Sequence, residues 1–261
     1  MSEKLETILA AARDHAAQVI APNVDAWNAA KAWPRAASDK AGAAGLTGLY
    51  APEELGGQGL PRSEGIQVYE QLGLGDGAYA FALSMHNICT FAGCGYGTAA
   101  FKDMWARELT SGRKLANFAL TEPQSGSDPM KMYTRATING DGTWTISGAK
   151  AWVSLATVAD VYFTVVKTSD APGHKDMAMI AIPADAPGIS FGPLYETPSY
   201  TFLPMSEMYL DNVVVSEDNI ILPIGQGFQG SLMASDIARV SIASGCCGLM
   251  QSALDTALSY A

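Results

Sequence analysis

The sequence is poor in the residues that build metal centres and disulfide frameworks. Its only cysteines are Cys89, Cys94, Cys246 and Cys247, and its only histidines are His15, His86 and His174. The cysteines form no C-x-x-C pair, and the histidines lack metal-ligand spacing. A chain of 261 residues can also form a stable core without disulfides. We therefore expect buried free thiols and no metal site.

Charged residues are also scarce, at 16% of the chain, and acidic residues outnumber basic ones by 26 to 16. The resulting net charge of −10 argues against a nucleic-acid-binding surface. A hydrophobic content of 48% excludes a disordered chain. An anionic ligand would have to be bound by backbone N–H groups and a few arginines or lysines.

The sequence shows no pattern typical of a targeting segment or a membrane anchor. The start, Met1 to Lys4, leads directly into a helical pattern and resembles neither a signal peptide nor an arginine-rich transit peptide. No apolar run is long enough to span a bilayer. These features predict a cytoplasmic protein, or a mitochondrial matrix protein if the source is a eukaryote.

Hydrophobic periodicity divides the chain into three parts. A helical period is present over 3–20, 36–45, 63–74, 78–90 and 98–110. A period of two follows, with predicted strands at 115–120, 132–138, 143–147, 160–167, 177–182, 189–195 and 206–213. The helical period returns from 229 to the end. We predict an α+β protein with an all-helical N-terminal domain (1–113), a middle antiparallel sheet or barrel (114–222) and the beginning of a C-terminal helical domain (223–261).

One polar loop follows the first predicted strand, at Leu120-Thr121-Glu122-Pro123-Gln124-Ser125-Gly126-Ser127-Asp128. Pro123 ends the strand, and Gly126 permits a turn that other side chains would forbid. Thr121, Ser125 and Ser127 place hydroxyls beside free backbone N–H groups, an arrangement that can bind an anionic or carbonyl-rich ligand. An ordinary Asx or ST turn explains the same residues if the loop is taken alone.

A second segment, Ser147-Gly148-Ala149-Lys150-Ala151-Trp152-Val153-Ser154, follows a hairpin signal at Asn139-Gly140-Asp141-Gly142. Together the two segments resemble the pattern T-E-P-x-x-G-S-D, hairpin, G-x-K-x-W-[IV]-[ST] of the acyl-CoA dehydrogenase family. The loop at 51–59 and the segment Asp236-Ile237-Ala238-Arg239 also resemble family motifs. The resemblance covers essentially the whole chain.

The resemblance implies an FAD-dependent enzyme of fatty acid metabolism that oxidises an acyl-CoA at its α and β carbons. The residues it implies for FAD binding are Leu120, Thr121, Gly126, Ser127, Trp152, Val153 and Ser154. It places Asp236 and Arg239 at the acyl-CoA. Without the motif, Trp152 would be interpreted as a core residue, and Asp236 with Arg239 as a surface pair. The family also implies an electron-transferring flavoprotein as acceptor and a homodimer or homotetramer.

The catalytic base is missing from the expected positions. Most of the family places a glutamate late in a C-terminal helical domain, which implies a chain longer than this one or a separate C-terminal chain. A smaller branch places it directly before the arginine of D-x-x-R, where this sequence has Ala238. The segment 196–206 also lacks the family's usual G-x-R/K run. No catalytic residue and no acyl chain can therefore be assigned.

Two alternatives remain open from the sequence. One is a related flavoenzyme on the same scaffold, such as an oxidase, a monooxygenase or a desulfinase-type member. The other is a non-catalytic subunit that pairs with a chain carrying the base.

Overall fold

The computed structural model describes residues 2–170 and 173–261 of the chain. Helices form its N-terminal part: α1 (Glu3–His15), α2 (Val24–Ala30), α3 (Arg35–Ala43), α4 (Arg62–Gly73), α5 (Gly77–Tyr96), α6 (Ala99–Phe101) and α7 (Arg107–Thr110). Two π-helical turns, Ala16–Ile20 and Lys102–Ala106, extend α1 and join α6 to α7. The predicted helices are present. Helix α2 was missed because it buries none of its residues and so leaves no hydrophobic period.

Strands occupy the middle of the chain: β1 (Ala116–Ala119), β2 (Arg135–Ile138), β3 (Thr143–Ser154), β4 (Val161–Lys167), β5 (Met177–Pro183), β6 (Ile189–Phe191), β7 (Met205–Ser216) and β8 (Ile220–Leu222). The hairpin predicted at 139–142 joins β2 to β3. The expected strand at 143–147 continues to Ser154, and the short strand β8 was not predicted. The α+β fold class is confirmed.

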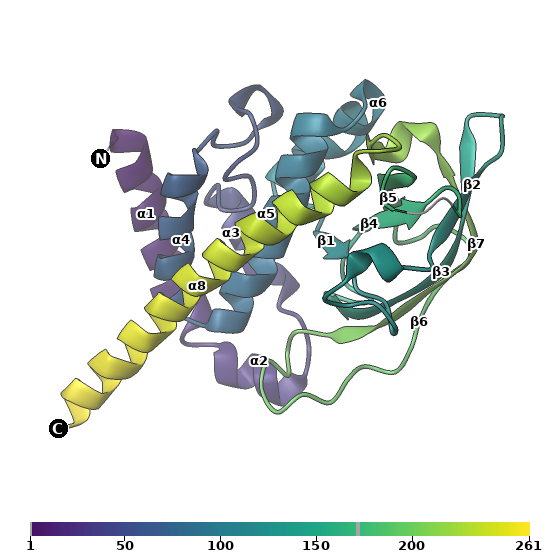
Figure 1. The fold of residues 1–261 in the computed structure, drawn as a ribbon. Helices are drawn as coiled ribbons and strands as arrows, with labels where there is room; N and C mark the ends of the chain where they lie inside the picture. The colour runs from purple at the N-terminus through teal and green to yellow at the C-terminus, as the bar shows by residue number, and fades with distance from the viewer. Residues whose placement is uncertain (1, 171–172) are drawn as a thin grey trace.

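The described strands form one sheet in the order β6-β7-β3-β2-β4-β5-β8, and β1 pairs with β4. The sheet is mixed and not wholly antiparallel as predicted, because β4 runs parallel to both β1 and β2. Strand β4 is buried on both faces. Phe163 packs toward α5 and the α6–α7 segment, whereas Tyr162 packs toward β3 and β7. Strand β1 lies between α5 and β4, so its C-terminal end lies where the helices meet the sheet (Figure 1).

Helix α8 (Gly227–Tyr260) runs across this junction and then along α4 and α5 (Figure 1). Backbone contact brings α8 close to α4: a Cβ added at Gly248 would lie 2.0 Å from the Glu70 carbonyl oxygen. Beyond this contact the last turns of α8 expose Met250, Leu254 and Leu258. The apolar face of this end of α8 therefore lacks a partner among the described residues.

By length and composition α8 is apolar enough to cross a membrane, contrary to the expectation that no apolar run is long enough to span a bilayer. It also carries Asp236 and Arg239 and packs against other helices, so a single helix of this kind is weak evidence for a membrane span. The expectation of buried thiols holds for Cys89 and Cys94 on α5. It is wrong for Cys246 and Cys247, which α8 exposes.

A buried histidine joins the helical part to the first strand. His86 on α5 accepts a hydrogen bond from the Ala116 N–H through Nδ1 at 3.0 Å, and its Nε2 faces the Leu109 carbonyl oxygen at 3.0 Å. Because Nδ1 accepts, the proton of the neutral ring is on Nε2. Burial lowers the pKa of His86 to about 4, so the ring is neutral in the folded protein at neutral pH.

This arrangement predicts a loss of stability in mild acid. Between the unfolded pKa of 6.5 and the folded pKa of about 4, the unfolded chain binds a proton that folded His86 does not. The free energy of unfolding should therefore fall as the pH decreases through this window, by roughly 3 kcal/mol from His86 alone. Urea melts of the wild type and His86→Gln between pH 7 and pH 4 measure this slope. Equal slopes in the two proteins would rule out His86 as the source.

Candidate functional site

The two motif segments meet at a buried ion pair. Lys150 on β3 and Glu122 in the loop after β1 lie 2.9 Å apart, with side chains 0% and 2% exposed. The Lys150 ammonium also donates to the carbonyl oxygens of Val165, at 3.0 Å, and Leu120, at 3.4 Å. One side chain thus connects β3, β4 and the end of β1.

The Glu122 carboxylate is surrounded by further donors. It accepts hydrogen bonds from the Tyr133 and Thr134 N–H groups, from the Thr134 hydroxyl and from the Gln124 amide. Burial alone would raise the pKa of Glu122, but Lys150 and these donors outweigh it and lower the pKa to about 2. Glu122 is therefore ionised at neutral pH, and its role is to hold the loop in place.

The anchored loop leaves several polar groups unused. Ser125, expected to face a ligand, is buried and donates its hydroxyl to the Asp128 carbonyl oxygen. In the described part of the chain, the hydroxyls of Thr121 and Ser127 and the N–H groups of Gly126 and Ser127 make no hydrogen bond to another residue. Free N–H groups and hydroxyls gathered in this way suit an anionic or carbonyl-rich ligand.

Gly126 does not have the role that its sequence context suggested. Its φ is not in the left-handed region, so the turn itself does not require glycine. A Cβ added there would meet only Thr121 Cγ2, at 4.0 Å. The missing side chain instead leaves open space beside Thr121.

Trp152 is exposed because β3 contains a bulge. Two residues of β3, Ala151 and Trp152, stand opposite the single residue Glu207 of β7, and Trp152 has a φ of 57°. The bulge turns the indole outward, so that 62% of Trp152 is exposed and its ring packs against Tyr195 with centroids 4.5 Å apart. The interpretation of Trp152 as a core residue is therefore wrong.

The end of β1 is fixed directly beside this bulge. The Ala151 N–H donates to the Thr121 carbonyl oxygen at 2.8 Å. Leu120, Thr121, Gly126 and Trp152 therefore belong to one constellation. Val153 and Ser154 follow on the same strand. The Val153 side chain is buried in the core, whereas the hydroxyl of Ser154 makes no hydrogen bond within the described residues.

Asp236 and Arg239 lie on α8, outside this constellation. Their side chains are 74% and 80% exposed and form an ion pair at 3.9 Å. Asp236 lines a cavity of about 270 Å³ together with Arg62, Ser63 and Ile66 of α4. Among the described residues, no hydrogen bond or ion pair joins Asp236 or Arg239 to the constellation around Trp152.

Glu122 and Lys150 are both letters of the motif, but neither was expected to have a role in the site. Lys150 lies beyond the strand predicted at 143–147 and follows Gly148 and Ala149, so its complete burial was not expected. The available signal was the alternation of β3, which places Lys150 on the same face as buried Ile146 because the bulge on β3 comes after Lys150.

The ion pair gives a direct stability prediction. Lys150→Met leaves the Glu122 carboxylate buried without its cation and should lower the free energy of unfolding by about 3–5 kcal/mol. Lys131→Met is a matched control, because Lys131 pairs with Asp128 in the same loop but both side chains are exposed. This control should cost less than about 1 kcal/mol. Urea unfolding measures both, and equal losses would show that Lys150 does not hold the loop.

Comparisons with known proteins match both parts of the chain. Residues 2–113 match the model for the acyl-CoA dehydrogenase N-terminal domain, and residues 117–213 match the model for the middle domain. The second match contains the whole constellation from Leu120 to Ser154.

Relatives and a solved structure agree with these matches. The chain is 32% identical over its full length to the glutaryl-CoA dehydrogenase of Desulfococcus multivorans, covering 68% of that protein. It is 30% identical over its full length to the mitochondrial isobutyryl-CoA dehydrogenase of Dictyostelium discoideum, covering 62% of it. A glutaryl-CoA dehydrogenase from Mycobacterium smegmatis, solved in complex with FADH2, superposes on the whole chain with a TM-score of 0.90 at 26% identity and is 66% covered.

The chain thus spans roughly two thirds of the length of the proteins that it matches. Within that span, both domain models align in order and the identity extends over the full chain. The chain belongs to the acyl-CoA dehydrogenase family.

Proposed function

We propose that this chain forms the FAD-binding part of an enzyme that removes hydrogen from the α and β carbons of an acyl-CoA. The observation that carries the proposal is the set of unpartnered polar groups around the exposed Trp152. These groups fit a flavin, whose pyrophosphate needs N–H donors and whose ring carries several carbonyl acceptors. The solved Mycobacterium smegmatis relative in complex with FADH2 supports the same assignment.

Different residues would bind the pyrophosphate and the flavin ring of FAD. The N–H groups of Gly126 and Ser127 and the Ser127 hydroxyl would bind the pyrophosphate. The hydroxyls of Thr121 and Ser154 would donate to the ring, with the backbone of Leu120 and Val153 at its edge, and the indole of Trp152 would cover it. When bound, FAD supplies the hydride-accepting chemistry. Hydroxyl donors at the ring would favour the negative charge of its reduced form.

Acyl-CoA is the proposed substrate. The relatives are named as dehydrogenases of glutaryl-CoA and isobutyryl-CoA, which supports an acyl-CoA substrate. The two names differ in the acyl group and so do not indicate which acyl chain this protein takes. The guanidinium groups of Arg62 and Arg239 lie near the α4–α8 cavity and would form ion pairs with the phosphates of CoA. Asp236 lines the same cavity. The family resemblance supports an electron-transferring flavoprotein as the acceptor.

The base that removes the α-proton is proposed to come from outside these 261 residues. Glu122 is the buried carboxylate of the loop after β1, and its pKa of about 2 makes it a poor base. Residue 238 is an alanine. The exposed apolar end of α8 also fits a surface that further protein covers, either a C-terminal domain, a separate chain or another copy.

The first test is the effect of Trp152 on FAD binding. Trp152→Ala should weaken FAD binding clearly, while the flavin-free protein loses less than about 1 kcal/mol of stability because the ring is exposed. Trp144→Ala is the matched control, since Trp144 lies on the same strand but is 3% exposed. It should cost about 3–5 kcal/mol without a specific effect on FAD. Titrations followed by flavin absorbance and thermal melts measure both. A protein that takes up no FAD at all would favour the non-catalytic subunit.

The second test concerns turnover. With FAD bound, residues 1–261 should bind acyl-CoA thioesters but oxidise them roughly 10²–10⁴-fold more slowly than a relative assayed in parallel, because a positioned base contributes about this factor. A panel of acyl-CoA substrates with an artificial electron acceptor gives the rates, and oxygen consumption identifies an oxidase or monooxygenase. Turnover equal to that of the relative would show that the base lies within these residues.

A further inference from the structure

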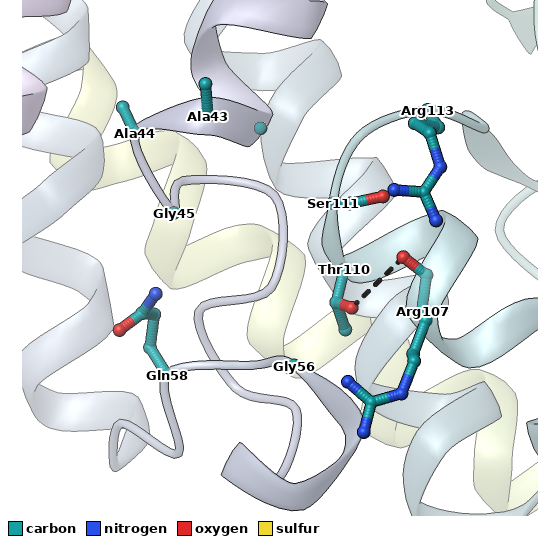
Figure 2. A pocket seen from close by; sticks show the side chains of 10 residues that line it. Ala43, Ala44, Gly45, Gly56, Gln58, Arg107, Thr110, Ser111 and Arg113 are labelled. Carbon is teal, nitrogen blue, oxygen red and sulfur yellow. Dashed lines mark hydrogen bonds between the residues drawn. The ribbon is translucent and has the colours of Figure 1, made fainter.

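A second cavity lies in the helical part, away from the constellation around Trp152. Its volume is about 500 Å³, within the range of small-molecule sites. Three segments form its walls: the end of α3 with the turn after it, the glycine-rich loop at 56–58, and α7 with the turn that follows it (Figure 2). The lining residues are Gly42, Ala43, Ala44, Gly45, Gly56, Gln58, Arg107, Thr110, Ser111 and Arg113. None of the residues proposed to bind FAD or acyl-CoA is among them.

The cavity is basic in a protein of net charge −10. Arg107 and Arg113 line it, and none of the ten described lining residues carries a carboxylate. Arg113 is neutralised by a bidentate pair with Glu108. The side chain of Arg107 has no ion pair within the described residues, and its one hydrogen bond to another residue runs from Nη2 to the Glu54 carbonyl oxygen at 2.8 Å. The charge of Arg107 is therefore uncompensated.

A second unpartnered group faces the same space. The side-chain amide of Gln58 makes no hydrogen bond to another described residue. It lies over Gly45, whose φ of 74° and missing Cβ make room for it, since an added Cβ would approach Gln58 Nε2 to 2.4 Å. Figure 2 shows Gln58 on one side of the cavity, with its amide turned toward Gly45, and the guanidinium of Arg107 on the other side, beside Gly56.

The walls of the cavity are fixed before any ligand binds. The backbone of α3 touches the turn after α7 at Gly42, where an added Cβ would lie 2.0 Å from the Ser111 carbonyl oxygen. Thr47 donates to the Thr110 carbonyl oxygen at 2.7 Å, and the Thr110 hydroxyl donates to the Leu55 carbonyl oxygen at 2.9 Å. A ligand would therefore enter a preformed site at little cost in ordering it.

We propose that this cavity binds a small molecule through a phosphate or carboxylate group held by Arg107, with Gln58 as a hydrogen-bond donor to another part of the same molecule. The free Nη1 of Arg107, which lies near Gly56, provides the charge-assisted hydrogen bond that such a group needs. A preformed pocket with an uncompensated guanidinium, an unpaired amide and no carboxylate selects anionic oxygens over cations. This site shares no residue with the proposed FAD and acyl-CoA sites.

The test uses the FAD-loaded protein, so that the proposed pyrophosphate-binding groups are occupied. Inorganic phosphate and acetate are titrated separately at low ionic strength by calorimetry, and saturable binding of at least one is expected. Arg107→Gln and Ala44→Asp should each weaken that binding about tenfold or more, the first by removing the cation and the second by adding a carboxylate to the wall. Arg13→Gln, an exposed arginine on α1, is the control and should bind as the wild type does.

The two probes distinguish the source of the anionic group. Binding of phosphate alone assigns a phosphorylated ligand, and binding of acetate assigns a carboxylate. If Arg107→Gln lowers the melting temperature, its loss of binding could reflect unfolding. The binding measured for Ala44→Asp then decides whether the cavity binds the anion, because this variant leaves the Arg107 contact to Glu54 in place. The proposal is overturned if neither probe saturates, if either pocket variant binds as the wild type, or if Arg13→Gln loses as much affinity as they do.

Discussion

The arrangement of polar groups around Trp152 depends on the burial of one ion pair, Glu122 with Lys150. A buried lysine is costly unless acceptors surround it, and here a carboxylate and two carbonyl oxygens do so. The partner carboxylate is equally well supplied with donors, from Thr134, Tyr133 and Gln124. Because these groups satisfy one another, the loop between β1 and β2 has a fixed position on β3. Its remaining N–H groups and hydroxyls are then free for a ligand.

The bulge in β3 at Trp152 forms the other side of the proposed site. The positive φ of Trp152 costs about 1–2 kcal/mol relative to an extended residue, and regular pairing of β3 with β7 would have avoided it. The bulge is what places a large aromatic ring outside the core, next to the end of β1. Strain of this kind fits the proposed role of Trp152 at the flavin ring, whereas Trp144 on the same strand packs into the core in the ordinary way.

The sequence predicted the parts that depend on local pattern. The helical periods before residue 110, the alternation between 115 and 215 and the hairpin at 139–142 all correspond to elements of the structure. The parallel pairing of β1 with β4 was not predictable, because register between strands 45 residues apart is a tertiary property. The motif indicated which loop and strand form the proposed flavin site. The ion pair was not predicted because Lys150 lies beyond the predicted strand at 143–147, and the exposure of Trp152 depends on a bulge that interrupts the alternation of β3.

The most direct test of the account is hydrogen exchange of the backbone amides with and without FAD, resolved to single segments. The account predicts that FAD slows exchange together at 120–128 and at 151–154, because the free N–H groups of Gly126 and Ser127 acquire acceptors while the bulge is covered. It predicts no change at 42–58, where the separate basic cavity lies. Unchanged exchange at 120–128 in a protein that has bound FAD would contradict the placement of the flavin on the loop held by Glu122 and Lys150.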